Sequence, residues 1–142
     1  MTNNFNIDRL RALIGGDINT RRRRREKEHQ LQVQCVKWFG HTHPELQGRL
    51  FAVPNGGRRD RATGAMLKAE GVVAGVADLI LLKPNNTHGA LLIEMKTEEN
   101  NSRQSDAQRQ WQKCVTSHDE YKYVVTRSFE AFVDAVETYL NQ

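Results

Sequence analysis

The 142-residue chain has little cysteine and no long apolar run. Its two cysteines, at positions 35 and 114, are too few for a disulfide framework and too far apart for a zinc knuckle. No segment approaches the roughly 18 to 20 apolar residues of a membrane span, and the N-terminus lacks the features of a secretory signal. No phosphate-binding P-loop or dinucleotide fingerprint is present, which predicts that no nucleotide cofactor is used. We therefore expect a cytoplasmic protein without a membrane partner.

The chain does have an excess of basic charge, with 21 Lys and Arg residues against 17 Asp and Glu and a net charge of +4. Residues 1–27 hold eight basic and three acidic residues, a net +5, so the remaining residues sum to −1. Five consecutive arginines, the arginine run, occupy positions 21–25. Clustered arginine binds phosphate through counterion release, which does not distinguish DNA from RNA. We predict a basic, flexible arm over residues 1–25, which tunes affinity, and a folded domain over residues 26–142.

Hydrophobic periodicity predicts alternating helices and strands after the arginine run. The expected helices cover residues 26–40, 60–70, 105–117 and 128–140, and the expected strands cover 49–53, 72–82, 90–97 and 121–127. Gly71 suits the C-terminal cap of the second helix, and Ser128 suits the N-cap of the last. This order predicts an α/β fold with a mixed sheet flanked by helices.

Polar residues interrupt two strands that are otherwise apolar. Asp78 lies near the start of the stretch ADLILL. Glu94 and Lys96 lie two residues apart on ALLIEMKT, so they point to the same face. If these strands form a hairpin that pairs Leu82 with Ala90, Asp78 lies directly opposite Glu94. Two adjacent carboxylates repel each other, and a divalent metal that prefers oxygen ligands compensates them. A buried salt bridge between Lys96 and an acid is the alternative.

At these residues the sequence resembles the PD-(D/E)XK nuclease superfamily and, more narrowly, the VRR-NUC (virus-type replication-repair nuclease) family. The resemblance covers about four fifths of the chain and rests on five motifs in the family's order. These motifs are EHQLQ at 28–32, VPNGGRR at 53–59, GVVAGVAD at 71–78, IEMKT at 93–97 and QRQW at 108–111.

The resemblance implies a restriction-endonuclease-like αβββαβ core with an added helix, and Mg²⁺- or Mn²⁺-dependent cleavage of DNA. It implies that Asp78 and Glu94 are metal ligands, with the Met95 carbonyl as a third. It also implies that Lys96 orients the attacking water or stabilises the transition state, and that Glu28 approaches the metal from the first helix. It suggests a role in phage or bacterial replication and recombination.

Two further helical residues are candidates from their spacing. Glu28 extends a stripe that continues through Gln32, Cys35 and Phe39 and faces the core, with Glu26 as the alternative acid. Gln108 lies three residues before Trp111, which would turn both towards the same core. A surface glutamine on a polar helix is the other interpretation of Gln108.

Phosphate contacts within the domain are expected from the loop after the first strand and from the helix that follows it. The two glycines of this loop allow close backbone approach, and its arginines are bidentate donors. A plain turn with solvated arginines is the alternative. The candidate DNA-binding residues are Asn55, Gly56, Gly57, Arg58, Arg59, Arg61 and Lys68.

These features predict a metal-dependent, structure-selective DNA endonuclease. Stand-alone members of the family that the chain resembles are similar to junction-resolving enzymes, which cut two opposed strands and need paired active sites. For a small chain with one active site, the resemblance therefore implies a homodimer that acts on branched DNA, such as four-way (Holliday) junctions. A sequence-specific restriction-type endonuclease and a non-catalytic nucleic-acid-binding adaptor are the alternatives. The sequence does not separate endonuclease from exonuclease action, or one metal ion from two.

Overall fold

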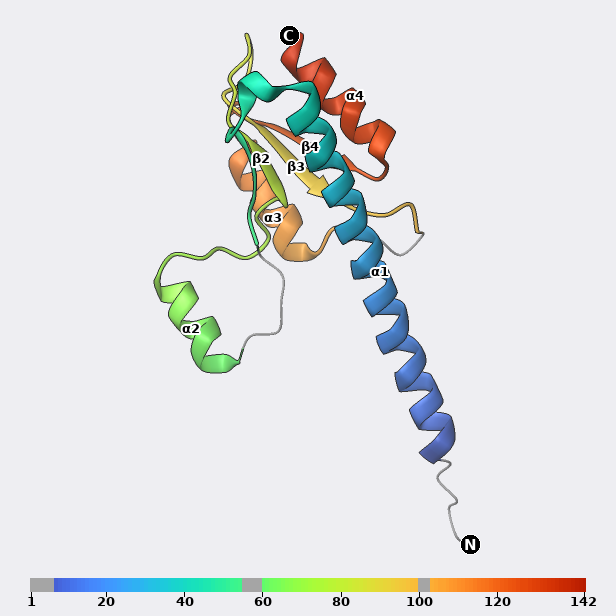
Figure 1. Ribbon diagram of the computed structural model, residues 1–142. Coiled ribbons are helices and arrows are strands. Elements are labelled where there is room, and N and C mark those ends of the chain that lie inside the picture. The colour runs from blue at the N-terminus through green and yellow to red at the C-terminus, as the bar shows by residue number, and fades with distance from the viewer. Residues whose placement is uncertain (1–6, 55–59, 100–102) are drawn as a thin grey trace, which may run out of the picture.

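The protein is described by a computed structural model over residues 7–54, 60–99 and 103–142, with side chains from residue 19 onwards (Figure 1). The bounds of the elements in chain order are α1 (Ile7–Thr42), the 3-10 helix η1 (Pro44–Leu46), β1 (Leu50–Ala52), α2 (Arg61–Ala69), β2 (Leu79–Leu81), β3 (Leu91–Met95), α3 (Asp106–Val115), β4 (Lys122–Thr126) and α4 (Phe129–Leu140). The predicted αβββαβ core, with α2 and α4 added, is confirmed.

One mixed sheet holds the four strands in the order β1-β2-β3-β4. β1 and β2 are antiparallel, and so are β2 and β3. Leu79 lies opposite Ile93 and Leu81 opposite Leu91, which confirms the predicted register of the hairpin. β4 runs parallel to β3, with Leu91 beside Lys122, because α3 provides the crossover that a parallel pair requires.

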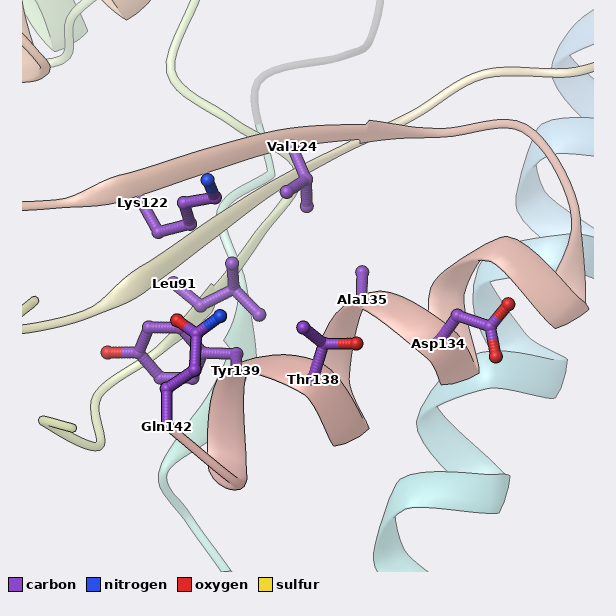
Figure 2. A pocket seen from close by; sticks show the side chains of 8 residues that line it. All are labelled: Leu91, Lys122, Val124, Asp134, Ala135, Thr138, Tyr139 and Gln142. Atoms are coloured by element: carbon purple, nitrogen blue, oxygen red, sulfur yellow. The ribbon is translucent and has the colours of Figure 1, made fainter. Parts of the chain in front are cut away.

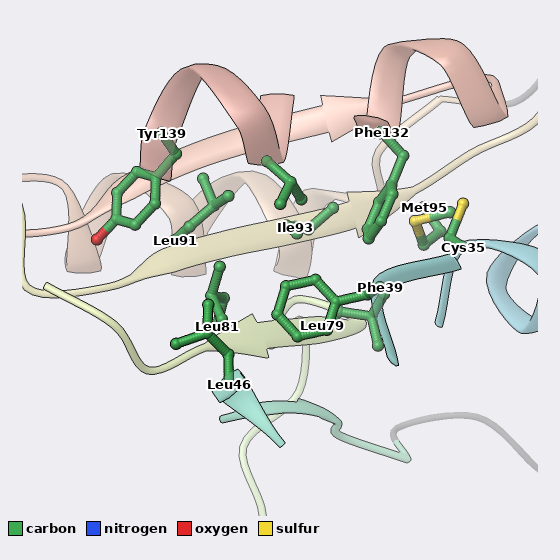
Figure 3. Packing of buried hydrophobic residues seen from close by; sticks show 11 residues of the cluster. Cys35, Phe39, Leu46, Leu79, Leu81, Leu91, Ile93, Met95, Phe132 and Tyr139 are labelled. Atoms are coloured by element: carbon green, nitrogen blue, oxygen red, sulfur yellow. The ribbon is translucent and has the colours of Figure 1, made fainter. Parts of the chain in front are cut away.

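The main hydrophobic core lies between one face of the sheet and the helices α1 and α4 (Figure 3). Leu79, Leu91 and Ile93 have no exposed surface, and neither do Cys35 of α1 and Phe132 of α4. On the opposite face of the sheet, Gln108 and Trp111 of α3 contact Glu94 of β3 and Tyr123 of β4, while Ile80 of β2 remains half-buried. This explains why β3 is buried at all five positions, including the polar Glu94.

Two predicted helix ends are confirmed by their hydrogen bonds. Ser128 caps α4, since its side chain accepts a bond from the Ala131 N–H at 3.1 Å. Gly71 follows the C-cap of α2 with φ of +98°, and the N–H groups of Gly71 and Val72 donate to Lys68 and Leu67. This pair of bonds is the Schellman motif, and its left-handed residue favours glycine.

Two segments differ from the predicted elements. α1 begins at Ile7 instead of residue 26, so the arginine run lies within this helix. Arginine, leucine and alanine are good helix formers, and the first proline that could end the helix is Pro44. The strand predicted over 72–82 is reduced to β2, because Gly75 has φ of +82° and residues 72–78 form an irregular approach to the sheet.

Candidate active site

Asp78 immediately precedes β2, and hydrogen bonds to neighbouring strands hold both its backbone and its side chain in place. Its carbonyl accepts a hydrogen bond from the Val53 N–H at 2.9 Å, which extends the pairing of β1 with β2. Its Oδ2 accepts from the Met95 N–H at 2.7 Å. The confirmed register places Asp78 opposite Glu94, on the face of the sheet that α3 covers. Burial raises the pKa of the Asp78 carboxyl.

Glu94 has no exposed surface, although it carries an ionisable group in the middle of the sheet. Its Oε1 lies 3.0 Å from Nζ of Lys96 and accepts a short hydrogen bond from Nε2 of Gln108. Its Oε2 is buried and has no hydrogen-bond partner among the residues that the structure describes. Burial, followed by the charge of Asp78, raises the pKa of Glu94 to about 7. A buried carboxylate with an unpaired oxygen is the kind of group that a cation would satisfy.

Gln108 is held in position by the first turn of α3. Its Oε1 accepts from the Ser105 N–H at 2.7 Å, while the Ser105 hydroxyl accepts from the Gln108 N–H at 3.2 Å. This reciprocal pair is a capping box, which satisfies two N–H groups at the helix start. The amide group of Gln108 therefore joins the cap of α3 to Glu94, and the prediction that it lines the site agrees with this contact.

Gly75 allows α3 to approach this closely. A Cβ atom at Gly75 would lie 2.3 Å from the backbone carbon and oxygen of Ala107, and 2.7 Å from the backbone nitrogen of Gln108. Because those atoms are backbone, they cannot move without moving the start of the helix. The irregular segment before β2 therefore determines the distance between the start of α3 and the carboxylates of Asp78 and Glu94.

Glu28 of α1 completes one wall of a cavity of about 360 Å³ that also contains Asp78, Glu94, Lys96 and Gln108. A second cavity, of about 310 Å³, shares Glu28, Asp78 and Met95 with the first and continues past Gln32 to the end of β1. The first cavity lies between α1 and α3, and the second lies between α1 and the end of β1. Because both are lined by Glu28, Asp78 and Met95, we describe the two together as the active-site groove. The structure thus brings together five residues that the sequence singled out: Glu28, Asp78, Glu94, Lys96 and Gln108.

Another cavity, of about 290 Å³, lies between β4 and α4 (Figure 2). Its walls include the apolar side chains of Leu91 and Val124, and among the described residues Asp134 is the one carboxylate that lines it. Without a second acid beside it, this cavity has no comparable chemistry.

Comparison with known proteins agrees with this arrangement. The VRR-NUC domain family matches residues 16–130, which is most of the chain. The chain belongs to the VRR-NUC family. VRR-NUC domains are nucleases of the PD-(D/E)XK type, with DNA as the implied substrate. A solved structure titled "VRR_NUC domain protein" has a similar fold, with a TM-score of 0.67 and 22% identity over 80% of this chain and 88% of that chain. No curated protein matches the sequence.

Among the described residues of this VRR-NUC chain, the groups that fit a metal ion are a pair of carboxylates instead of a larger cluster. Within the described ranges, no group of three or more His, Cys, Asp or Glu side chains converges closely enough to hold one. Asp78 and Glu94 do face each other, and Mg²⁺ is commonly held by one or two carboxylates, with water or substrate oxygens completing its coordination. The unpaired Oε2 of Glu94 fits that pattern. Glu28 lines the same cavity from α1.

Tyr123 and Gln104 are site residues that the sequence interpretation missed. Nε2 of Gln104 donates to the Tyr123 hydroxyl at 3.2 Å, and burial and the charge of Glu94 raise the pKa of Tyr123. The ring of Tyr123 lies 6.2 Å from that of Trp111 on α3. The sequence pattern does indicate this position for Tyr123. Its neighbours on β4 face the core, so Tyr123 points to the opposite face of the sheet, towards α3.

The predicted DNA-binding residues are only partly described. Asn55, Gly56, Gly57, Arg58 and Arg59 lie outside the described residues. Arg61 and Lys68 are exposed on α2, and their spacing of seven residues places them on one side of that helix. No helix in the described part of the chain has the length and apolar character needed to span a membrane.

Proposed function

We propose that this VRR-NUC chain is a Mg²⁺- or Mn²⁺-dependent endonuclease that hydrolyses phosphodiester bonds in branched DNA such as four-way junctions. It works as a homodimer in the replication, recombination or repair of phage or bacterial DNA, in the cytoplasm. The observation that carries the proposal is Glu94, a fully buried carboxylate with one unpaired oxygen, opposite Asp78 and beside Lys96.

Asp78, Glu94 and the Met95 carbonyl are the groups that would hold the metal, with Glu28 approaching from α1. A bound Mg²⁺ or Mn²⁺ supplies a Lewis acid that polarises the phosphate and lowers the pKa of water. Neutralising the two carboxylates also strengthens the binding of an anionic DNA strand in the groove, because bare carboxylates repel phosphate.

Lys96 supplies the positive charge on the protein side. Its Nζ has little exposed surface and lies 3.0 Å from Glu94, so it is positioned before substrate arrives. A preorganised ammonium stabilises the negative charge that develops on the phosphorus oxygens during hydrolysis. Gln108 holds Glu94 in one orientation through its capped amide, which keeps the unpaired Oε2 directed away from Gln108.

The proposed substrate follows from the number of sites. Resolving a junction requires a cut in each of two opposed strands, and this chain contributes one carboxylate pair. Two copies related by a two-fold axis would present two such pairs to a branched substrate, which has a matching symmetry.

Cleavage of labelled duplex, flap, single-stranded and four-way-junction DNA with Mg²⁺ or Mn²⁺ tests the proposal. We expect junction cleavage that Asp78→Asn and Lys96→Ala abolish or reduce about a hundredfold or more. Asp134→Asn and Lys113→Ala, which change exposed residues of the same types, serve as matched controls and should retain activity.

Three results would contradict the proposal. Equal cleavage by the Asp78 and Lys96 variants would remove the assigned chemistry. Salt-sensitive binding without cleavage would favour a non-catalytic adaptor, and discrete plasmid fragments would favour a sequence-specific restriction-type enzyme. Light scattering at micromolar concentration tests the dimer, and a monomer there would refute it.

A further inference from the structure

We propose that the arginine run is a rigid phosphate-binding track on α1 that prolongs the active-site groove, with Arg21, Arg24 and Arg25 facing the DNA. This inference rests on the proposed function, because it takes DNA as the ligand of the groove. In a rigid helix, arginines on different faces have different roles, whereas in a flexible arm all five would contribute alike to DNA binding.

The face of α1 that packs on the sheet can be followed along the helix. Phe39 and Cys35 are buried in the core, and Glu28, seven residues before Cys35, lines the active-site cavity. In Figure 1 the N-terminal part of α1 extends past the sheet and away from the other elements. The same face therefore emerges from the domain beside the active site and continues into the arginine run.

The helical repeat of about 100° per residue decides which arginines share this face. Relative to Glu28, Arg21 and Arg24 are rotated by about 20° and 40°, and Arg25 by about 60°. Arg22 and Arg23 are rotated by about 120° and 140°, on the other side of the helix. All five lie in one continuous helix, and their side chains are exposed except for the half-buried Arg24.

The track lies within a few nucleotides of the candidate metal site. Arg25 and Arg21 precede Glu28 by three and seven residues, which corresponds to about 4.5 Å and 10.5 Å along the helix axis. A DNA strand rises about 3.4 Å per nucleotide, so these arginines span about one to three phosphates from the groove. Their reach matches the backbone of the strand that would occupy the site.

A tether fixes the rotation of α1 at this point. Glu99, three residues after Lys96, lies 2.5 Å from Nζ of Lys27 and 3.9 Å from Nε of Arg24. The segment that follows the active-site strand is thus paired with α1 at Lys27, next to Glu28, and at Arg24, one turn earlier. This pairing holds the helix face that carries Arg21 and Arg25 in line with the groove.

The charge distribution explains why the binding of DNA at this site would require the arginine track. The candidate site concentrates acids at Glu28, Asp78 and Glu94, and residues 28–142 sum to −1. Phosphate therefore needs a nearby source of positive charge besides the metal, and clustered arginine provides bidentate contacts to phosphate oxygens.

Two double variants of equal charge test the inference in the full-length chain. Arg21→Gln with Arg25→Gln changes the groove side, and Arg22→Gln with Arg23→Gln is the matched control on the opposite side. Fluorescence anisotropy with a labelled four-way junction and a labelled duplex, in EDTA from 50 to 200 mM NaCl, measures binding. Circular dichroism checks that the helix content of both variants is unchanged.

We expect the groove-side pair to weaken binding by about tenfold or more at 50 mM NaCl and to lower the salt slope by about 2, since each lost phosphate contact removes about 0.9. The opposite pair should change both quantities much less. Equal losses in the two variants would indicate a flexible polybasic arm and overturn the track, and so would no loss in either. Cleavage by the unmodified chain with Mg²⁺ is measured separately, so a failure of the nuclease proposal is distinguishable from a failure of the track.

Discussion

The buried carboxylates make the stability of the metal-free protein dependent on pH in a direction that can be worked out. The folded state raises the pKa of Glu94 from 4.5 to about 7 because the group is buried next to Asp78. The folded protein therefore binds this proton more tightly than the unfolded chain does. Stability is lost as the pH rises from about 4.5 to about 7, and the full cost is present above that window.

The magnitude follows from the same values. A shift from 4.5 to about 7 corresponds to about 3 kcal/mol at high pH, most of which develops between pH 5 and pH 8. Burial raises the pKa of Asp78 as well, so its contribution has the same sign. This loss is a large part of the about 5–15 kcal/mol that typically stabilises a domain.

Urea denaturation in EDTA at pH 5 and pH 8 measures this loss, with Glu94→Gln as the test variant. Between pH 5 and pH 8, the free energy of unfolding should fall less in the variant than in the unmodified chain, by about 2 to 3 kcal/mol. Comparing the two proteins cancels the titration of the histidines, which both contain. Glu120→Gln, at an exposed position, is the matched control and should behave like the unmodified chain.

The same pH dependence in the Glu94 variant and the unmodified chain would refute the reasoning. A second measurement checks the cation. Mg²⁺ binds deprotonated carboxylates, so it should raise the unfolding midpoint more at pH 8 than at pH 5.

Three other predictions follow from the site and the core. Gly75→Ala should lower the cleavage rate by about tenfold or more, because the added Cβ would displace the start of α3. Gly71 also has a positive φ but has open space around it, so Gly71→Ala should lower stability without lowering the cleavage rate. Gln108→Ala should reduce the unfolding free energy by about 1–2 kcal/mol in a denaturation assay, since it removes a cap and a bond to a buried acid. A thiol reagent should modify the exposed Cys114 in the native protein and Cys35 only after unfolding, because burial raises the pKa of Cys35 to about 12; rapid modification of both native thiols would contradict this.

The sheet was predictable from the sequence because its register depends on short-range features. Two apolar strands joined by a polar turn leave few possible pairings, and a slip of one residue would have turned Leu79 and Ile93 away from the core. The meeting of Asp78 and Glu94 follows directly from that register. The family match then agreed with motifs that were already identifiable in the sequence.

Other features depended on contacts that the sequence pattern does not contain. Gly75 falls within the strand predicted over 72–82, but in the structure it allows a close approach to the backbone of α3, which lies about thirty residues further along the chain. Tyr123 was predicted to lie on a strand, but its proximity to Glu94 was not predictable from the strand pattern. That proximity depends on the parallel pairing of β4 with β3. The start of the first helix was predicted at residue 26 instead of Ile7, because charge composition does not show whether a helix continues through an arginine run.

The sheet topology also determines when, during folding, the chain could become an active nuclease. β2 and β3 form a local hairpin that brings Asp78 and Glu94 together from positions 16 residues apart. Gln108 arrives only with the α3 crossover, and Glu28 only when α1 docks from far along the sequence. Contacts of long sequence separation form late because the loop entropy must be lost first. A growing or partly folded chain would therefore have its acids paired before its supporting groups are in position, and we expect it to leave DNA intact until the last helices have docked.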